Sequence, residues 1–158
     1  TVTGLTDCQV STIRRATNTA LGSYIKAINY PQTMNSTGIS TVDTLPRDSN
    51  EAYLSIMAHN GGGKITGGEC VVNGNSVIDP ISQELDDYIV NARGLAAVDG
   101  VFNYSFSDGS IKGILPMQGV TELRLKTTFG TAPENSNYDL IAVSIRNVPA
   151  QMLAAVRA

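Results

Sequence analysis

Hydrophobic and polar residues alternate most regularly near the end of the chain. From Thr121 to Phe129, apolar or threonine side chains occupy every second position, with charged or polar residues between most of them. Successive side chains of a strand leave opposite faces of a sheet, so this period predicts a half-buried antiparallel strand. After the polar segment Gly130–Asn137, Tyr138–Val148 predicts a second strand, which we expect to pair with the first. The apolar face of this second strand consists of Ile141, Val143 and Ile145.

A helical period precedes these strands, at the beginning of the chain. Thr6 followed by Gln9 matches the capping box, in which two side chains satisfy amide groups at a helix N-terminus. Apolar residues then recur every three or four positions, as in the buried stripe of an amphipathic helix. The dipeptide Tyr30-Pro31 ends the predicted helix, because the residue before a proline avoids the helical region. The stripe consists of Val10, Ile13, Ala16, Ala20, Leu21, Tyr24, Ile25 and Ile28.

Turn-forming residues dominate the next segment, Gln32–Asn50, which predicts a long surface loop with at most a short strand at Ile39–Leu45. Glu51–Ala58 is apolar on both faces and predicts a buried strand. The glycine-rich segment His59–Lys64 interrupts regular structure, and Cys70–Val72 is a further short apolar run.

A second helix is predicted to begin at Asp79-Pro80, with the aspartate as N-cap and the proline at the first helical position. Gly94 is a natural terminator of this helix, because glycine readily adopts the left-handed conformation. The apolar stripe of the helix consists of Ile81, Leu85, Tyr88, Ile89 and Ala92. The residues expected to face water are Glu84, Asp86 and Asp87.

The segment Val101–Leu115 predicts a hairpin, because Asp108-Gly109 suits a two-residue turn. Pro149 then begins a short terminal helix. Counting outward from the turn, the expected cross-strand pairs are Phe106 with Ile111, Tyr104 with Gly113 and Phe102 with Leu115. The apolar side of the terminal helix is Met152, Leu153 and Val156.

These elements predict one domain spanning residues 1–158 and an α+β fold. We expect a mostly antiparallel sheet of five or six strands with helices packed on it. The alternative is an all-β jelly roll with helical insertions. No internal repeat or low-complexity linker divides the chain.

Composition and charge exclude some classes of function. The 158 residues are 42% hydrophobic and 16% charged, which fits a folded protein with a polar but weakly ionic surface. The net charge of -3 argues against a strong nucleic-acid face, which needs clustered Lys and Arg. No apolar run approaches the roughly 20 residues of a membrane-spanning helix.

The candidate reactive residues are few. His59, the one histidine, is a candidate general base beside the glycine-rich loop, but a polar residue at a strand end is the more frequent role. Cys8 falls in the first turn predicted for the first helix, where the dipole favours a thiolate, although most free cysteines are buried hydrophobes. A disulfide between Cys8 and Cys70 is a third option that the sequence leaves open.

Other motifs resemble sites only superficially. Gly61-Gly62-Gly63-Lys64 lacks the spacing of a phosphate-binding loop, so a mobile hairpin tip is expected there instead. Thr1 leads toward a predicted helix rather than the strand that an N-terminal nucleophile needs. The acidic residues near the second helix lack the EF-hand spacing and are expected to be solvated. These residues are Asp79, Glu84, Asp86 and Asp87. We therefore assign no catalytic, cofactor-binding or metal-binding residue.

The end of the chain resembles a known family. The strand Leu123–Phe129, the loop at Pro133, the segment Tyr138–Ala142 and the terminal segment Pro149–Leu153 resemble the closing part of small non-enveloped RNA virus coat proteins. The resemblance covers about a quarter of the chain and implies no individual site. The sequence departs from the family by lacking a basic arm for RNA and by having two predicted helices where strands are expected.

We therefore expect a self-assembling structural subunit of a viral coat or shell, located in the virion, rather than an enzyme. Its partners are copies of itself, with no cofactor, membrane or strong nucleic-acid contact. The expected contact elements are Gln32–Asn50, Gly130–Asn137 and the terminal helix. The alternative is a secreted or cytosolic enzyme or ligand-binding domain that uses the glycine-rich loop around His59.

Overall fold

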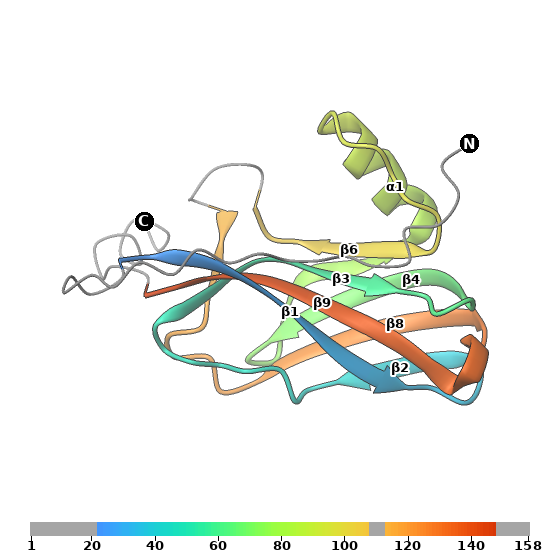
Figure 1. Cartoon of the computed structure of the whole chain (residues 1–158), viewed down its shortest axis with the longest axis horizontal. Coiled ribbons are helices and arrows are strands. Elements are labelled where there is room, and N and C mark those ends of the chain that lie inside the picture. Colours follow the sequence, from blue (N-terminus) through green and yellow to red (C-terminus); the bar gives the residue numbers. More distant parts are fainter. Residues whose placement is uncertain (1–21, 108–112, 148–158) are drawn as a thin grey trace, which may run out of the picture.

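A computed structural model of the chain describes residues 22–107 and 113–147, which form two antiparallel sheets packed face to face (Figure 1). One sheet has the order β1-β9-β3-β6, with β7 pairing to β3, and the other has the order β2-β8-β4-β5. The strands of the first sheet are β1 (Tyr24–Thr33), β9 (Asn137–Arg146), β3 (Glu51–His59), β6 (Val101–Ser105) and β7 (Leu115–Pro116). Those of the second are β2 (Gly38–Val42), β8 (Leu123–Thr131), β4 (Lys64–Val72) and β5 (Asn75–Ser82).

This architecture corrects the predicted α+β class. Among the described residues, helical structure is confined to α1 (Gln83–Ala92) and short 3-10 turns such as Glu134–Ser136. Consecutive strands mostly lie in opposite sheets, and the chain returns to the first sheet with its last described strand. A five-stranded and a four-stranded sheet joined in this way form a jelly roll, so the alternative prediction fits and the single sheet with packed helices is wrong. That all of residues 1–158 form one domain stays a prediction.

The first predicted helix is wrong over its last turns, where β1 pairs with β9 along its whole length from Tyr24 to Thr33. Tyr24, Ile25 and Ile28 fit a helical spacing, but from Lys26 onward the partly buried residues of β1 alternate with exposed ones. Pairing with a neighbouring strand therefore decided between the two periods. Pro31 lies within β1, which is an edge strand and tolerates a missing N–H. The earlier part of the predicted helix lies outside the described residues.

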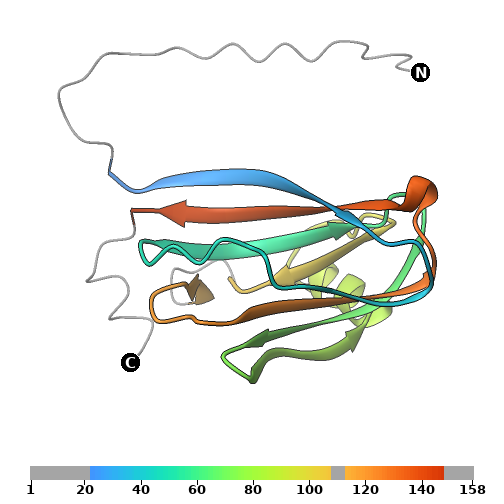
Figure 2. The same ribbon diagram turned by 90° about the horizontal axis from the view of Figure 1, so that it is seen from below.

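The two strands predicted near the end of the chain exist as β8 and β9, but they do not pair with each other. Along β8 the buried residues alternate as the period predicted, from Leu123 to Phe129. Each strand instead lies between two others, β8 between β2 and β4 and β9 between β1 and β3, as Figure 2 shows for β9. The polar segment between them crosses from one sheet to the other, which local periodicity does not reveal.

The second predicted helix begins three residues later than expected, and β6 pairs elsewhere than in the predicted hairpin. Asp79 and Pro80 belong to the edge strand β5, and Ser82 is the N-cap of α1, accepting a hydrogen bond from the amide of Leu85. Gly94 follows the helix with a φ of 75°, as predicted. β6 pairs with β3, so Tyr104 lies opposite Ile56, not Gly113. The predicted turn itself lies outside the described residues.

The loop Gln32–Asn50 is also shorter than expected. Its first two residues extend β1, and Gly38–Val42 forms β2, close to the short strand that was anticipated. Leu45 is buried, and the hydroxyl of Tyr53 donates a hydrogen bond to the carbonyl oxygen of Pro46 at 2.8 Å. Leu45 and Pro46 therefore hold the second half of this loop against the core.

The core lies between the inner faces of the two sheets and is crossed by a hydrogen-bonded contact. Tyr104 of β6 is fully buried, and its hydroxyl lies 2.7 Å from Thr127 Oγ1 and 2.9 Å from the carbonyl oxygen of Lys126 on β8. Gly68 on β4 leaves room for this contact, since an added Cβ would lie 2.5 Å from the Phe102 ring and 2.7 Å from the Tyr104 hydroxyl. Polar groups buried in this way stabilise only when paired.

A second tyrosine links the sheets at another place in the core. The hydroxyl of Tyr138 on β9 lies 2.7 Å from Ser40 Oγ on β2. Its ring packs edge-on against Phe129 of β8, with centroids 5.0 Å apart.

In residues 22–107 and 113–147, no helix has the length and apolarity needed to cross a membrane.

Replacing Tyr104 by phenylalanine tests the contact between the sheets. Tyr104→Phe removes the hydroxyl and leaves Thr127 without this partner in a dry core, so we expect a loss of about 1–3 kcal/mol in unfolding free energy. Urea unfolding measures this loss. Tyr24→Phe, at an exposed position at the start of β1, is the control and should stay within about 0.5 kcal/mol. Equal effects of the two substitutions would contradict the role of the buried hydroxyl.

Candidate assembly surface

His59 lies at the end of β3, exposed, between Asp139 of β9 and Val101 of β6. The carboxylate of Asp139 accepts a hydrogen bond from Asn29 Nδ2 at 2.9 Å. Within the described part of the chain, the imidazole has no hydrogen bond or ion pair and no group of three potential metal ligands occurs. His59 therefore lacks the oriented partner that a general base needs.

The glycine-rich loop after His59 contacts another part of the fold closely. The carbonyl of Gly61 accepts a hydrogen bond from the amide of Glu134 at 2.8 Å. A Cβ at Gly61 would overlap the carbonyl oxygen of Asn137, and one at Gly62 would lie 2.7 Å from the Glu134 side chain. Asn60 closes the turn, donating from Nδ2 to the carbonyl of Gly63 at 2.6 Å. The glycines allow two loops to meet, which differs from the free hairpin tip that was predicted.

The cysteines are placed only in part. Cys70 is fully buried on β4, and burial raises the pKa of its thiol to about 12. A protonated thiol of this kind behaves as a small hydrophobic side chain. Cys8 and Thr1 lie outside the described residues, so the candidate nucleophiles at those positions and the Cys8–Cys70 disulfide stay open.

The acidic residues near α1 do not form a shared cation site, and one of them is buried. Asp86 is 2% exposed and accepts hydrogen bonds from the backbone amide of Asn103 at 2.8 Å and from its Nδ2 at 3.3 Å. Burial raises the pKa of the Asp86 carboxyl, and the bonds from Asn103 oppose part of the increase. The prediction that Asp86 faces water is therefore wrong, while Asp79 and Glu84 are exposed as predicted.

Asp86 belongs to a row of polar side chains that attach α1 to the edge strand β6. Gln83 donates from Nε2 to the carbonyl of Val101 at 2.9 Å, and Arg93 donates from Nη1 to Ser105 Oγ at 2.6 Å. With the bond from Asp86, the helix thus reaches residues 101, 103 and 105 of β6. These contacts satisfy groups on the side of β6 that no strand covers.

Because the polar side of α1 faces the sheet, much of its apolar side faces outward. Leu85 is 45% exposed and Tyr88 is 71% exposed, whereas the predicted stripe required both to be buried. The loop after α1 runs back beside the helix toward β6 (Figure 1). This loop contains Leu95 and Val98, which are also exposed. We call Leu85, Tyr88, Leu95 and Val98 the α1 outer face. Exposed apolar clusters of this kind are typical of interaction sites.

Two cavities adjoin this end of the molecule. One of about 350 Å³ lies on the outer surface of the second sheet, where Ile39 and Ile81 provide apolar walls and Lys126 is ion-paired with Glu69 at 2.8 Å. The other, of about 490 Å³, lies between the glycine-rich loop and Gln83. Both are open hollows with mixed polar and apolar linings, which suits contact with another surface more than enclosure of a small molecule.

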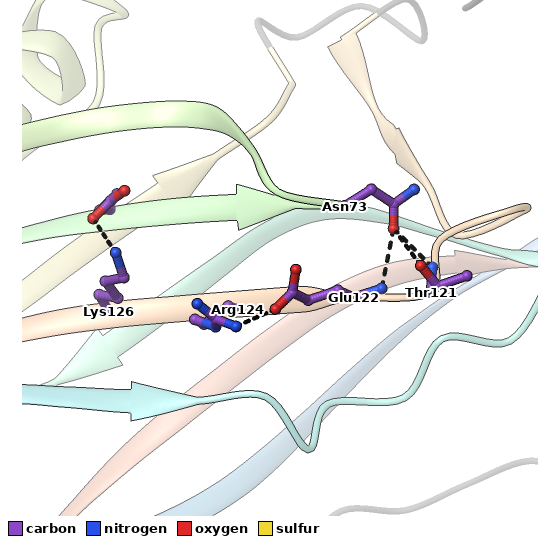
Figure 3. A network of polar contacts seen from close by, with 6 residues as sticks. Asn73, Thr121, Glu122, Arg124 and Lys126 are labelled. Atoms are coloured by element: carbon purple, nitrogen blue, oxygen red, sulfur yellow. Dashed lines mark hydrogen bonds and ion pairs between the residues drawn. The ribbon is translucent and has the colours of Figure 1, made fainter.

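The outer surface of β8 is organised by a row of polar contacts (Figure 3). Asn73, in the turn between β4 and β5, accepts hydrogen bonds through Oδ1 from the amides of Thr121 and Glu122 at 2.8 and 3.0 Å. Farther along the strand, Arg124 pairs with Glu122, and Lys126 pairs with Glu69. These charges are neutralised within the chain, so this surface offers no free basic stripe.

The loops that the sequence predicted as contacts between copies already make contacts within the chain, so only part of their surface is exposed. In Gly130–Asn137, Pro133 is buried and Glu134 bonds to Gly61, while Asn135 remains exposed. The terminal helix lies outside the described residues. Sequence reasoning missed the α1 outer face because a helical stripe is ordinarily assigned to the core. The signal in the sequence was that Gln83 and Asp86, which can form hydrogen bonds to a strand edge, lie on the opposite side of the helix. That β6 is the edge strand they bond to is known only from the structure.

The comparisons with known proteins agree with this architecture. Residues 24–145 match the family profile of the viral coat protein P2 C-terminal domain. The major capsid protein P2 from bacteriophage PM2 superposes with a TM-score of 0.72 at 20% identity, covering 84% of this chain and 48% of that protein. The PBCV-1 virus capsid superposes with a TM-score of 0.55 at 9% identity, covering 77% of this chain and 46% of that one.

The chain thus spans about half the length of the capsid chains that it matches. At these identities the structural likeness establishes the fold alone, and the family assignment comes from the profile. No curated protein matches the sequence.

Substituting Gly61 tests whether the glycine-rich loop is a point of close approach. Gly61→Ala should destabilise the protein by more than about 2 kcal/mol, because the methyl group overlaps the Asn137 carbonyl in addition to the cost of a positive φ. Gly74→Ala is a matched control, with a positive φ but open space, and should cost about 1 kcal/mol. Thermal and urea unfolding measure both. Equal losses of unfolding free energy in the two variants would mean that Gly61 is not in close contact with the Asn137 loop.

Substituting Asp86 tests its burial through the pH dependence of stability. The folded pKa lies above the ordinary value of 3.8, so the folded state binds more protons between the two values. The associated stability is complete below the ordinary pKa and is lost as the pH rises through the folded pKa. The unfolding free energy of the wild type minus that of Asp86→Asn should therefore fall as the pH rises from about 3 to 7. Asp79→Asn, at an exposed site, controls for net charge, and a difference that rises with pH would refute the assignment.

Proposed function

Because this chain belongs to the viral coat protein P2 C-terminal domain family, we propose that it serves as a jelly-roll structural subunit that associates with its own copies in a viral coat. The observation that supports this most directly is the family match over residues 24–145, which spans the chain from β1 to β9. The resemblance to viral coat proteins noted in the sequence is confirmed by this membership.

The physical character of the surface is consistent with such a role. A coat subunit must present fixed contact surfaces on a body that does not rearrange, and here sheet pairing and the buried tyrosines hold the two sheets together. Exposed apolar side chains occur on α1 and at the start of β1, where Ile25 is 68% exposed. A stable contact between copies requires about 1,200–2,000 Å² of buried surface, which several such patches can supply together.

The virion is the location that follows from a coat function. Contacts with nucleic acid and with membranes stay predictions of absence, based on the net charge of -3 and the lack of long apolar runs. The hypothesis of an enzyme using His59 receives no support from the geometry around that residue, where no acid–base pair is found among the described residues.

Solution mass distinguishes the two hypotheses. Light scattering on the purified chain, across micromolar to millimolar concentrations, should give masses well above 16.7 kDa that grow with concentration. Negative-stain imaging of the same samples should show particles or oligomers of regular size. His59→Ala should leave the mass distribution unchanged. A monodisperse monomer at every concentration would refute the proposal that copies associate.

A further inference from the structure

We propose that the α1 outer face is the docking site for residues 148–158 of a neighbouring copy of the chain. This inference rests on the proposed function, because it specifies one contact through which copies associate. It identifies the receiving surface by Leu85 and Tyr88 and the docking segment by Met152, Leu153 and Val156.

The receiving surface exists because α1 is attached through its polar side. Gln83, Asp86 and Arg93 are used for hydrogen bonds to β6, so Leu85 and Tyr88 have no place in the core. An exposed tyrosine next to exposed aliphatic residues is the composition found at the centre of protein interfaces. The buried side of the helix is therefore mixed, with Val90 buried beside Asp86, while Leu85 and Tyr88 require a partner to leave water.

Charge around this surface restricts the partner. Exposed Glu84 and half-buried Asp87, whose Oδ1 accepts a hydrogen bond from Gln83 Nε2 at 2.8 Å, give the α1 outer face an acidic margin. Asp99 lies farther along, in a hollow that it shares with Lys64. The one nearby arginine of the helix, Arg93, is directed toward Ser105. A complementary partner is thus apolar with a positive charge and no acidic group.

Residues 148–158 have this composition. The segment contains Arg157 as its one charged side chain and no Asp or Glu. Its sequence predicts a helix from Pro149 in which Met152, Leu153 and Val156 share a side, the spacing by which an amphipathic helix inserts apolar anchors against another surface. Arg157 follows the last anchor and can pair with the acidic margin.

The register of the sheet places the origin of this segment far from α1 of the same copy. Asp86 contacts Asn103, which lies level with Met57 and, through it, with Ile141 of β9. From Ile141 to Asn147 there are six residues, or about 20 Å along the strand. β9 and β6 are two strand spacings apart, which adds about 10 Å across the sheet.

A helical segment is too short to cover that distance. With a helix from Pro149, two connecting residues span at most about 7 Å and four helical residues about 6 Å, which keeps Leu153 within about 13 Å of Asn147. The first half of α1, where Leu85 lies, is more than about 20 Å away. Docking of the predicted helix on this surface therefore requires a second copy of the chain.

Disulfide trapping between two populations tests the contact. In a Cys8→Ser background, one population carries Tyr88→Cys and the other carries Leu153→Cys; Cys70 is retained because its buried thiol is unreactive. The two are mixed, concentrated and exposed to a mild oxidant, and linked peptides are identified by mass spectrometry. We expect Tyr88→Cys to link to Leu153→Cys at least about tenfold more than Val77→Cys does, since Val77 is exposed on β5 outside the α1 outer face.

Each other result overturns the inference in a distinguishable way. Links within one chain in a Tyr88→Cys/Leu153→Cys double variant, kept dilute, would show docking in the same copy. In a separate Tyr88→Cys variant that keeps Cys8, links between Tyr88→Cys and Cys8 would indicate that residues 1–21 occupy the surface. Large assemblies without any link to Tyr88→Cys would refute this contact while leaving the proposed function intact. A monomeric wild type would refute both.

Association strength provides a second measurement. Leu85→Ser and Tyr88→Ser should each weaken self-association about tenfold or more, as expected for apolar anchors at an interface centre. Val77→Ser is the matched exposed control and should change association less than about twofold. Arg157→Glu should weaken association more at low salt than at high salt, because it places a negative charge against the acidic margin. Unchanged association in all three variants would refute the contact.

Discussion

The hydrogen-bonded contact of Tyr104 with Thr127 and the Lys126 carbonyl joins the two sheets at the centre of the core. It depends on Gly68, whose missing side chain leaves space for the rings of Phe102 and Tyr104. A sandwich of two sheets has no covalent link at this point, so paired polar groups and close packing define how the sheets lie on each other. Tyr138 and Ser40 repeat the arrangement elsewhere in the core. The outer surfaces, including α1, have fixed positions because these inner contacts do.

The second constraint is that the edge of a sheet must be covered. β6 has β3 on one side only, and the polar residues of α1 satisfy groups along its free side. This use of Gln83, Asp86 and Arg93 leaves Leu85 and Tyr88 in water. A requirement of the isolated fold therefore generates the apolar surface that suits contact with another copy. The same logic explains the glycine-rich loop, in which missing side chains allow two loops to meet rather than a ligand to bind.

Membership of the viral coat protein P2 C-terminal domain family also bears on the features by which the sequence differed from the coat-protein pattern. Two predicted helices appeared to stand where strands were expected in a coat protein. The last turns of the first, from Tyr24 onward, are replaced by β1, while its earlier part lies outside the described residues. The second is shortened at its start by β5, which includes Asp79 and Pro80. Where the described residues test these departures, the helical period was one that a strand also satisfies, while α1 remains a helix. The lack of a basic arm remains a feature of the sequence.

The sequence by itself determined the strands Glu51–Ala58 and Leu123–Phe129, the end of α1 at Gly94 and the resemblance to coat proteins, because each depends on local periodicity, glycine conformation or motif. Strand partners, and hence the jelly roll, were decided by tertiary structure, since β8 and β9 pair with segments distant in sequence. The side of α1 that is buried was likewise decided there. A helical stripe predicts which residues lie on the same side of a helix. Whether that side faces the core or the solvent depends on the strand edge that lies beside the helix.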